Sequence, residues 1–428
     1  MFLGAIAFLV FLVWRPPPPP VVEVNAGGFD PAIASAILET RDAARGAPRS
    51  AEKRGRMGQV LLAHEVWAES RRCFEQAMAL DPRELRWPYL LGVSRLADSP
   101  SDAALAFERA VRLSPERESA PRLKLAQVLL GLGRLDEAES LYRHVYAREP
   151  NSAVALLGLG RVAAARDHWS VAVDFLNAAA ADASTRKAAH RLLLNVNQQL
   201  GRTNEAGRNA KALADLPNDE PPLDPYLSEV ERLKTGEEAW INTADEWIKK
   251  GQVSEAAELL EKTLKSYPRS DRALFFLGRA RLRLGDARGA ESILTQAVEL
   301  APDSIEAQLQ LGATRLYRGR PKEAQACFRA AIKAKPNLGE AWFNLGLSLG
   351  AKSERPECIR AFREAIRLRP NLFEAYLGLA VILRAEGELQ AAALELRRAL
   401  ALGPPDALRE KLFAHLALVE PGSRGAGK

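Results

Sequence analysis

The chain has 428 residues, of which 47% are hydrophobic and 27% charged, a composition typical of globular proteins and unlike that of collagen or a wholly disordered chain. Its 60 basic and 54 acidic side chains leave a formal net charge of +6, which by itself does not indicate a nucleic-acid-binding protein. Three cysteines, Cys73, Cys327 and Cys358, are too few and too scattered for a disulfide framework or a metal cluster, so we expect buried thiols.

The first fourteen residues, MFLGAIAFLVFLVW, carry no charged side chain and precede Arg15 and five prolines. This pattern predicts a signal peptide or an N-terminal membrane anchor with a Pro-rich stretch in residues 1–26, and Val24 to Ala26 offer small residues for a signal peptidase. A helix of fourteen residues spans roughly 21 Å, less than the roughly 30 Å of a hydrocarbon core, so cleavage and anchoring both stay open. We expect a membrane-anchored or exported protein; a cytosolic protein with a misassigned start is the alternative.

Residues 27–50 are expected to form a linker and one short helix. Asp30 followed by Pro31 predicts an N-cap and a first helical turn, and the helix should continue to about Ala44. The repetitive part of the chain follows it.

From Ala51 onward the sequence repeats with a period near 34 residues. Prolines stand at 268, 302, 336, 370 and 404, each 34 residues after the previous one, and earlier prolines at 82, 115 and 150 are 33 and 35 residues apart. Such a period indicates a stacked array. Within a unit, apolar and small residues recur at helical spacing at positions 4, 7 and 8 and again at 20, 24 and 27. We therefore predict two antiparallel amphipathic helices per unit, with a turn glycine at position 15 (Gly285, Gly319 and Gly387) and a terminating proline at position 32.

These residues resemble the tetratricopeptide repeat family, whose pattern is an aromatic residue at position 4, Leu and then Gly or Ala at 7 and 8, Ala at 20, an aromatic residue at 24, Ala at 27 and Pro at 32. Ten units are similar to it, and they begin at residues 51, 85, 119, 153, 187, 237, 271, 305, 339 and 373. Position 4 is aromatic at Trp240, Trp342 and Tyr376. Aromatic residues at or next to position 24 are Phe74, Phe107, Tyr142, Phe328 and Phe362.

Some positions depart from the family pattern. The unit from 187 has Leu194 at the small site, and Arg281 and Arg315 stand at position 11, where an apolar or aromatic residue is usual. The resemblance still covers residues 51–406. It implies an all-α fold, a right-handed α-α superhelical solenoid of about ten units in two arrays.

The predicted domains follow from the repeat boundaries. Residues 51–217 form a first array of about five units, the last degenerate, and residues 237–406 form a second array of five units. Between them, residues 218–236 (NDEPPLDPYLSEVERLKTG) predict a linker, with Tyr226 to Lys234 able to form an extra helix. Residues 407–428 should contain a capping helix, from about Asp406 to Val419, and a disordered tail.

No catalytic domain remains once the repeats are subtracted, so we expect a non-enzymatic protein without a cofactor, catalytic residues or a metal. The glycines of GLGRVA, from Gly158, fall inside a repeat helix and follow no strand, which argues against a phosphate-binding loop. The five histidines fall in different units without ligand-like pairing, and they are His64, His144, His168, His190 and His415.

In the resembled family the first helices line a concave surface, and positions 2, 5, 9, 12 and 13 tend to face a bound peptide. Position 5 of the second array holds one large apolar residue per unit: Ile241, Phe275, Leu309, Phe343 and Leu377. Cationic side chains flank this stripe: Lys249, Arg272, Arg279, Arg283 and Arg384. The hypothesis is a groove for an extended or helical partner segment, with acidic partner residues favoured. Packing between units and a solvated charged face are the alternative explanations of these residues.

These expectations together predict a scaffold that binds protein or peptide partners at or beyond a bacterial cytoplasmic membrane; the bacterial origin rests only on the Ala-, Arg- and Leu-rich composition. The membrane would be contacted through the N-terminal segment if that segment is retained. An alternative from another class is an accessory subunit of an enzyme system in cell-envelope assembly or glycan transfer, with catalysis on a second chain. Nucleic acid is not expected as a partner, and binding to it would show a steep dependence on salt.

Overall fold

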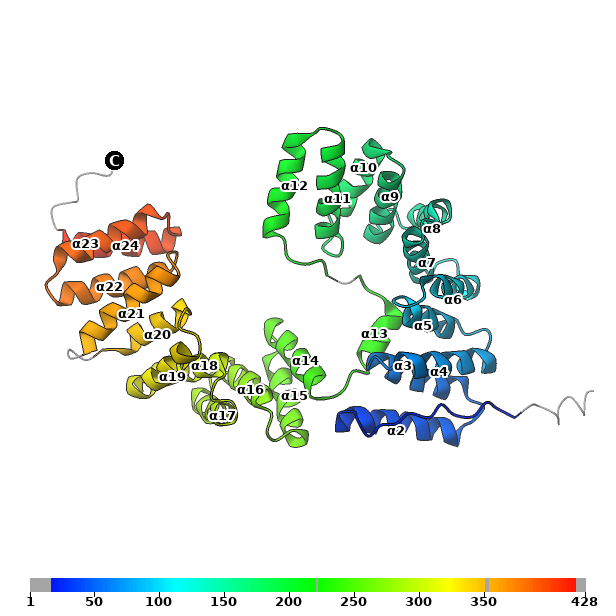
Figure 1. The fold of residues 1–428 in the computed structure, drawn as a ribbon, viewed down its shortest axis with the longest axis horizontal. Coiled ribbons are helices and arrows are strands. Elements are labelled where there is room, and N and C mark those ends of the chain that lie inside the picture. Colours follow the sequence, from blue (N-terminus) through cyan, green and yellow to red (C-terminus); the bar gives the residue numbers. More distant parts are fainter. Residues whose placement is uncertain (1–16, 221, 351–353, 421–428) are drawn as a thin grey trace, which may run out of the picture. The chain divides into compact units, whose positions relative to one another are not determined.

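The structure is a computed structural model, and it describes residues 17–220, 222–350 and 354–420. Within these residues the secondary structure is helical and no β-strand occurs (Figure 1). The expected all-α fold with repeat packing is confirmed. The apolar start of the predicted signal or anchor, residues 1–16, lies outside the described residues. Among the helices described, none combines the length and the apolarity needed to cross a membrane.

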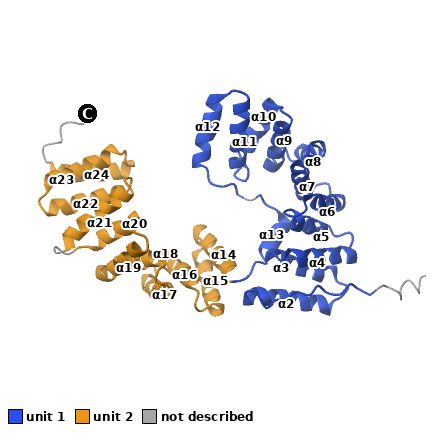
Figure 2. Cartoon of the chain, in the orientation of Figure 1, with its two compact units in different colours: residues 1–236 blue, residues 237–428 orange. Residues whose placement is uncertain are grey.

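The chain divides into two compact units, residues 1–236 and residues 237–428 (Figure 2). The helices of the first unit are α2 (Pro31–Gly46), α3 (Ala51–Ala63), α4 (Trp67–Leu80), α5 (Arg86–Arg95), α6 (Pro100–Leu113), α7 (Ala120–Gly131), α8 (Leu135–Arg148), α9 (Ala153–Ala165), α10 (Trp169–Ala179), α11 (Arg186–Gln199), α12 (Thr203–Asp215) and α13 (Pro225–Glu231).

The second unit begins directly with a repeat. Its helices are α14 (Glu237–Lys249), α15 (Val253–Ser266), α16 (Asp271–Arg283), α17 (Ala287–Leu300), α18 (Ile305–Tyr317), α19 (Pro321–Ala334), α20 (Gly339–Ser348), α21 (Arg355–Leu368), α22 (Phe373–Ala385), α23 (Leu389–Ala401) and α24 (Asp406–Val419).

In both units the helices pack as consecutive pairs, and each pair packs on the next. The first helix of a pair also contacts the first helix of the following pair, as α16 contacts α18 and α18 contacts α20. Because a single pair cannot bury its own apolar face, the core of each unit is a chain of contacts between neighbouring pairs.

The small residue at position 8 explains why the two helices of a pair approach so closely. A Cβ atom built on Gly312 would lie 2.6 Å from the Phe328 ring of the same unit, and one built on Gly346 would lie 2.8 Å from Phe362. Phe328 and Phe362 are buried. Each aromatic ring from the second helix thus occupies the space that a side chain on the first helix would otherwise fill.

The last pair of the first array shows why its sequence departs from the pattern. Ala206 is the only buried residue of α12, and Leu194 of α11 is half-buried. Among the described residues of the first unit, no further repeat packs on α12. A terminal helix without a following neighbour has no second apolar face to bury, so its positions lose the family pattern.

The predicted turn glycines are confirmed. Gly285, Gly319 and Gly387 have φ of +83°, +72° and +82° and follow the first helix of their pairs. These angles lie in the left-handed region, which glycine adopts without steric cost. Glu65 and Asp167 fill the same turn in two units of the first array, with φ of 61° and 59°.

The predicted burial of the thiols is also confirmed, because Cys73, Cys327 and Cys358 are buried. Burial raises the pKa of the Cys73 thiol to about 12 and that of Cys358 to about 11.

Candidate protein-binding surfaces

The position-5 residues of the second array lie on the first helices α14, α16, α18, α20 and α22, but they are not equally accessible. Ile241 of α14 is 0% exposed and belongs to a core cluster with Ala244 and Leu260. The expectation that it faces a partner is wrong, because its side chain is consumed by packing between α14 and its neighbours. Four half-buried residues remain on successive first helices, and we call them the apolar track: Phe275, Leu309, Phe343 and Leu377.

The apolar track rests on the core beneath it. Leu309, Phe343 and Leu377 pack against the core cluster that contains Phe328 and Phe362. The Phe343 and Phe362 ring centroids are 6.0 Å apart. The residues of the apolar track therefore contribute to packing between units, as the alternative explanation expects, and part of their surface also remains exposed.

Three of the predicted cations lie close to acids of α14. Arg279 lies 3.1 Å and Lys249 2.7 Å from the Asp245 carboxylate, and Arg279 also stands over the Phe275 ring, 5.7 Å from its centroid. Arg272 is 3.9 Å from Glu238. The structure thus brings these three cations together with two acids of α14, which compensate part of their charge within the array.

The remaining two predicted cations lie apart from that cluster. Arg283 donates a hydrogen bond to the backbone oxygen of Ile248 at 2.7 Å. Arg384 is half-buried near the end of α22. Arg283 thus stabilises the end of α14, and Arg384 stands on a different helix.

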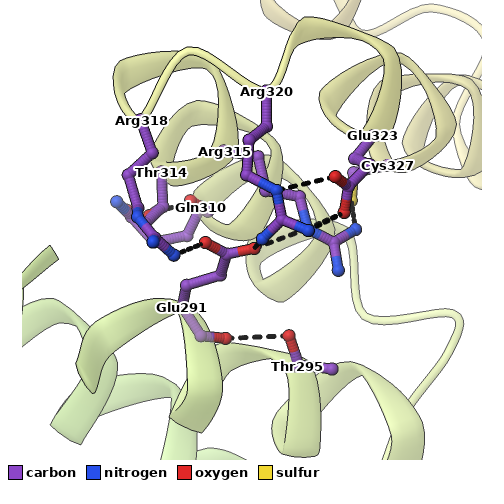
Figure 3. A network of polar contacts seen from close by, with 9 residues as sticks. All are labelled: Glu291, Thr295, Gln310, Thr314, Arg315, Arg318, Arg320, Glu323 and Cys327. Carbon is purple, nitrogen blue, oxygen red and sulfur yellow. Dashed lines mark hydrogen bonds and ion pairs between the residues drawn. The ribbon is translucent and has the colours of Figure 1, made fainter. Parts of the chain in front are cut away.

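Glu291 of α17 is the centre of a polar network that the sequence analysis did not identify (Figure 3). Its side chain is nearly buried, and the residue is 5% exposed. Arg315 Nε and Arg320 Nη1 lie 3.3 and 2.5 Å from its carboxylate, and Arg318 contacts the other carboxylate oxygen. Three guanidinium groups from α18 and the turn after it therefore share one carboxylate of the preceding second helix.

The same arrangement explains the unusual arginines at position 11. Arg315 reaches Glu291 on the second helix of the preceding unit, and Arg281 reaches Glu261 of α15 in the same way, at 2.5 Å. An ion pair between units thus replaces the apolar contact that is usual at this position. The signal was present in the sequence as two departures from the family pattern.

The first array contains a second feature that the sequence analysis did not place. Helix α13 packs against α3 and α5, the first helices of the first two pairs (Figure 1). Tyr89, which occupies position 5 of its unit, faces it: the rings of Tyr89 and Tyr226 are 4.6 Å apart. The Tyr89 hydroxyl donates a hydrogen bond to the Asp224 carboxylate.

Further contacts fix both ends of α13. At its start, the Tyr226 hydroxyl donates to the Glu118 carboxylate, and Lys124 Nζ lies 3.7 Å from Asp224. Near its end, Val230 is 4% exposed within the core cluster of the first array, and Glu229 lies 3.5 Å from Arg56. Each of these contacts joins α13 to a first helix or to the turn before one.

Burial and the nearby carboxylates raise the pKa of both tyrosines, Tyr89 and Tyr226, so their hydroxyls stay protonated and remain donors. Prolines and acidic residues indicated a break at 218–236. They gave no indication that this segment returns to the face of the array, because that depends on contacts between residues more than 100 positions apart.

Curated relatives match part of this chain. Cellulose synthase 1 operon protein C of Komagataeibacter xylinus is 28% identical over 226 residues, which are 50% of this chain and 16% of the relative. The chain thus spans about a sixth of the length of that protein.

Solved structures are similar over less than half of the chain. MamA from Desulfovibrio magneticus RS-1 matches 39% of this chain and 94% of its own, with 22% identity and a TM-score of 0.37. The thermophilic TPR protein TTC0263 of Thermus thermophilus matches 42% of this chain and 99% of its own, with 23% identity and a TM-score of 0.34.

Family profiles cover a larger share of the sequence. Profiles described as tetratricopeptide repeat match residues 56–118, 130–196, 248–311, 281–346 and 348–407, together more than half of the chain. These matches fall on the helix pairs described above. The chain belongs to the tetratricopeptide repeat family.

Proposed function

We propose that this chain is a non-enzymatic scaffold that holds segments of protein partners against the first helices of its repeats. One observation carries the proposal: in the first array, a helical segment is already seated on that face, with Tyr226 against the position-5 residue Tyr89. The apolar track occupies the corresponding face of the second array. Among the described residues of the second unit, no helix covers that track as α13 covers the first array.

The chemistry of the track indicates what it would bind. Phe275, Leu309, Phe343 and Leu377 offer apolar contacts at one-unit spacing, which suits an extended or helical partner segment with apolar residues on one side. Burying 400 Å² of such surface would contribute on the order of 10 kcal/mol before the cost of ordering, at about 25 cal/mol per Å². Much of that is lost on association, so micromolar affinity is expected.

The cations contribute less than the sequence suggested. The Asp245 carboxylate compensates part of the charge of Arg279 and Lys249 within the array, so the attraction of acidic partner residues is reduced. We expect the affinity for a partner to depend weakly on salt.

A cell-envelope role is the more specific proposal. The similarity to a protein named for a cellulose synthase operon supports an accessory role in polysaccharide synthesis, with catalysis on another chain. The apolar segment predicted in residues 1–26 supports a position at or beyond the membrane. Sequencing the N-terminus of the protein from the membrane and soluble fractions tests this. An unprocessed N-terminus on protein that is absent from the membrane fraction would contradict it.

The groove proposal is tested with the double variant Phe275→Ser and Phe343→Ser. Copurification from the native host, followed by mass spectrometry, should lose specific partners, while circular dichroism shows unchanged helicity. Leu394→Ser is the matched control, because Leu394 is an exposed leucine on α23, the second helix of its pair. Loss of helicity in the double variant, or unchanged partner recovery with the fold intact, would each refute the proposal.

A further inference from the structure

Helix α13 occupies a groove on the first array, and the groove has a defined chemistry. We call it the first-array groove and define it by Arg56, Tyr89, Glu118, Leu123 and Lys124, which lie on α3, α5, α7 and the turn before α7. We propose that α13 is a displaceable occupant of this groove, and that the groove also binds a helix of the same chemistry from a partner protein.

The contacts of α13 describe that chemistry. Asp224 caps the helix by accepting hydrogen bonds from the Tyr226 and Leu227 amides, both at 3.1 Å. The same carboxylate is the acceptor for the Tyr89 hydroxyl and lies 3.7 Å from Lys124. One aspartate therefore both starts the helix and docks it.

The side chains that follow complete the pattern. Tyr226 packs on Tyr89 and its hydroxyl donates to Glu118, while Val230, four residues later on the same helix face, is buried. A matching partner is a short amphipathic helix with an acidic N-cap, a tyrosine in its first turn and an aliphatic residue four positions further on.

The groove has room for more than α13 fills. A cavity of about 220 Å³ adjoins the start of α13, lined by Leu123, Lys124, Gln127, Pro222 and Asp224 among others. Leu223 also lines this cavity, but it is 90% exposed and leaves the cavity open. A longer partner segment could place an apolar side chain there, which α13 does not.

The short length of α13 and the non-helical segments around it favour its displacement. It has 7 residues, whereas the repeat helices have 10 to 14, and a helix this short does not form without its docking contacts. Residues 216–220, 222–224 and 232–236 on either side are not helical. A tether of this kind typically provides an effective concentration in the millimolar range, so an external helix must bind more tightly than α13 does or be abundant.

This inference rests on the proposed function in that both use the first helices as a binding face, and the position of α13 on the first array supports both. It concerns the first array, whereas the variants that test the proposed function lie in the second, so either can fail alone.

The test uses the full chain and a fluorescein-labelled synthetic peptide of residues 222–236, with binding followed by fluorescence anisotropy. The double variant Tyr226→Ala and Val230→Ser releases α13 and leaves every groove residue in place. We expect it to bind the peptide at least tenfold more tightly than the unchanged chain. Adding Lys124→Glu to the released variant should remove most of that gain, because the peptide then meets like charge at Asp224.

Equal affinity of the released and unchanged chains would overturn the proposal. A loss of helical signal larger than the 7 residues of α13 can account for would also overturn it, because the repeats would then depend on α13 for their fold. Hydrogen exchange of the unchanged chain gives an independent reading. The amides of α13 should exchange at least tenfold faster than those of α5. Equal protection of the two helices would contradict displacement.

Discussion

The Arg54 guanidinium donates hydrogen bonds to the backbone oxygens of Pro19 and Pro20, 2.7 and 3.1 Å away, in a site where the side chain is 1% exposed. It also donates to the Gln76 side chain at 2.5 Å. Burial lowers the pKa of this guanidinium, which nevertheless remains charged at neutral pH. The proline-rich residues before the repeats are therefore bound to the first array through α3.

Truncation should therefore destabilise the first unit. A chain that begins at Gly27 lacks the Pro19 and Pro20 acceptors and leaves a buried guanidinium partly unsatisfied, which should cost about 2 kcal/mol of unfolding free energy. In that truncated chain, Arg54→Met should recover part of the loss because it removes the uncompensated charge. In the full chain the same substitution should be destabilising. Urea unfolding of the full and the truncated chain, each with and without Arg54→Met, measures these effects. If the substitution changes the unfolding free energy in the same direction in both chains, the role given to Arg54 is wrong.

The glycines of the helix pairs are not equivalent, and alanine substitution should separate them. Gly312→Ala places a Cβ atom 2.6 Å from the Phe328 ring, and the overpacking should destabilise the second unit by about 1–3 kcal/mol. Gly207 lies within α12 and a Cβ atom there meets nothing within 4 Å. Gly207→Ala should therefore stabilise the first unit by up to about 1 kcal/mol through helix propensity. Thermal unfolding measures both; changes of the same sign would refute the packing argument.

The Glu291 network should be sensitive to loss of its one nearly buried carboxylate. Glu291→Gln leaves Arg315, Arg318 and Arg320 facing one another without their shared acid, and we expect a loss of about 3 kcal/mol. Glu261→Gln is the matched control, since Glu261 pairs with Arg281 but is about half exposed. It should cost less than about 1 kcal/mol.

Urea unfolding compares these two variants with the unchanged chain. Addition of sulfate should restore part of the Glu291→Gln loss, because the anion can bind the three guanidinium groups that no longer share an acid. Equal effects of the two substitutions would show that the number of arginines around Glu291 is energetically unimportant.

A pH dependence is expected from His64, which follows α3. Burial lowers its pKa, and neighbouring Lys234 lowers it further. The folded unit therefore favours the neutral imidazole, so the unfolded chain binds more protons below its pKa of 6.5. This contribution to stability is fully present above pH 6.5 and is lost as the pH falls from there toward the folded-state pKa.

His64→Gln removes the titrating group and retains a polar side chain near Thr235, whose hydroxyl lies 3.3 Å from Nε2 of His64. The unfolding free energies of the two proteins are compared from pH 7.5 to 5. As the pH falls, the unchanged chain should lose stability relative to the variant. A constant difference would rule out a lowered pKa.

The parts of the fold that could be predicted are those that depend on neighbours within one or two units. The period places Gly312 opposite Phe328 and Gly285 at a turn, because both depend on positions within a single helix pair. The burial of Ile241 could not be predicted in the same way. It depends on how α14, the first helix of the second unit, packs on α15 and α16.

The contacts between residues far apart in the sequence could not be predicted for a different reason. Tyr89 and Asp224 are 135 residues apart, and neither belongs to a motif that would link them. The Glu291 network could be predicted in part. Arg315 at position 11 was an exception to the family pattern, and the exception pointed to a polar contact without saying which acid would receive it.

The contact between a glycine and an aromatic ring has a consequence for how such a chain can change in length. Gly346 and Phe362 belong to one unit, and Phe362 also meets Gly378 of the next, 2.6 Å from where its Cβ would lie. Tyr142 makes the same contact with Gly158 of the unit that follows it, at 2.3 Å. Because these two joints are built alike, we expect that whole units between them can be removed or duplicated in steps of 34 residues and that the new ends still match. A deletion of any other length would interrupt one unit and separate its glycine from its aromatic ring.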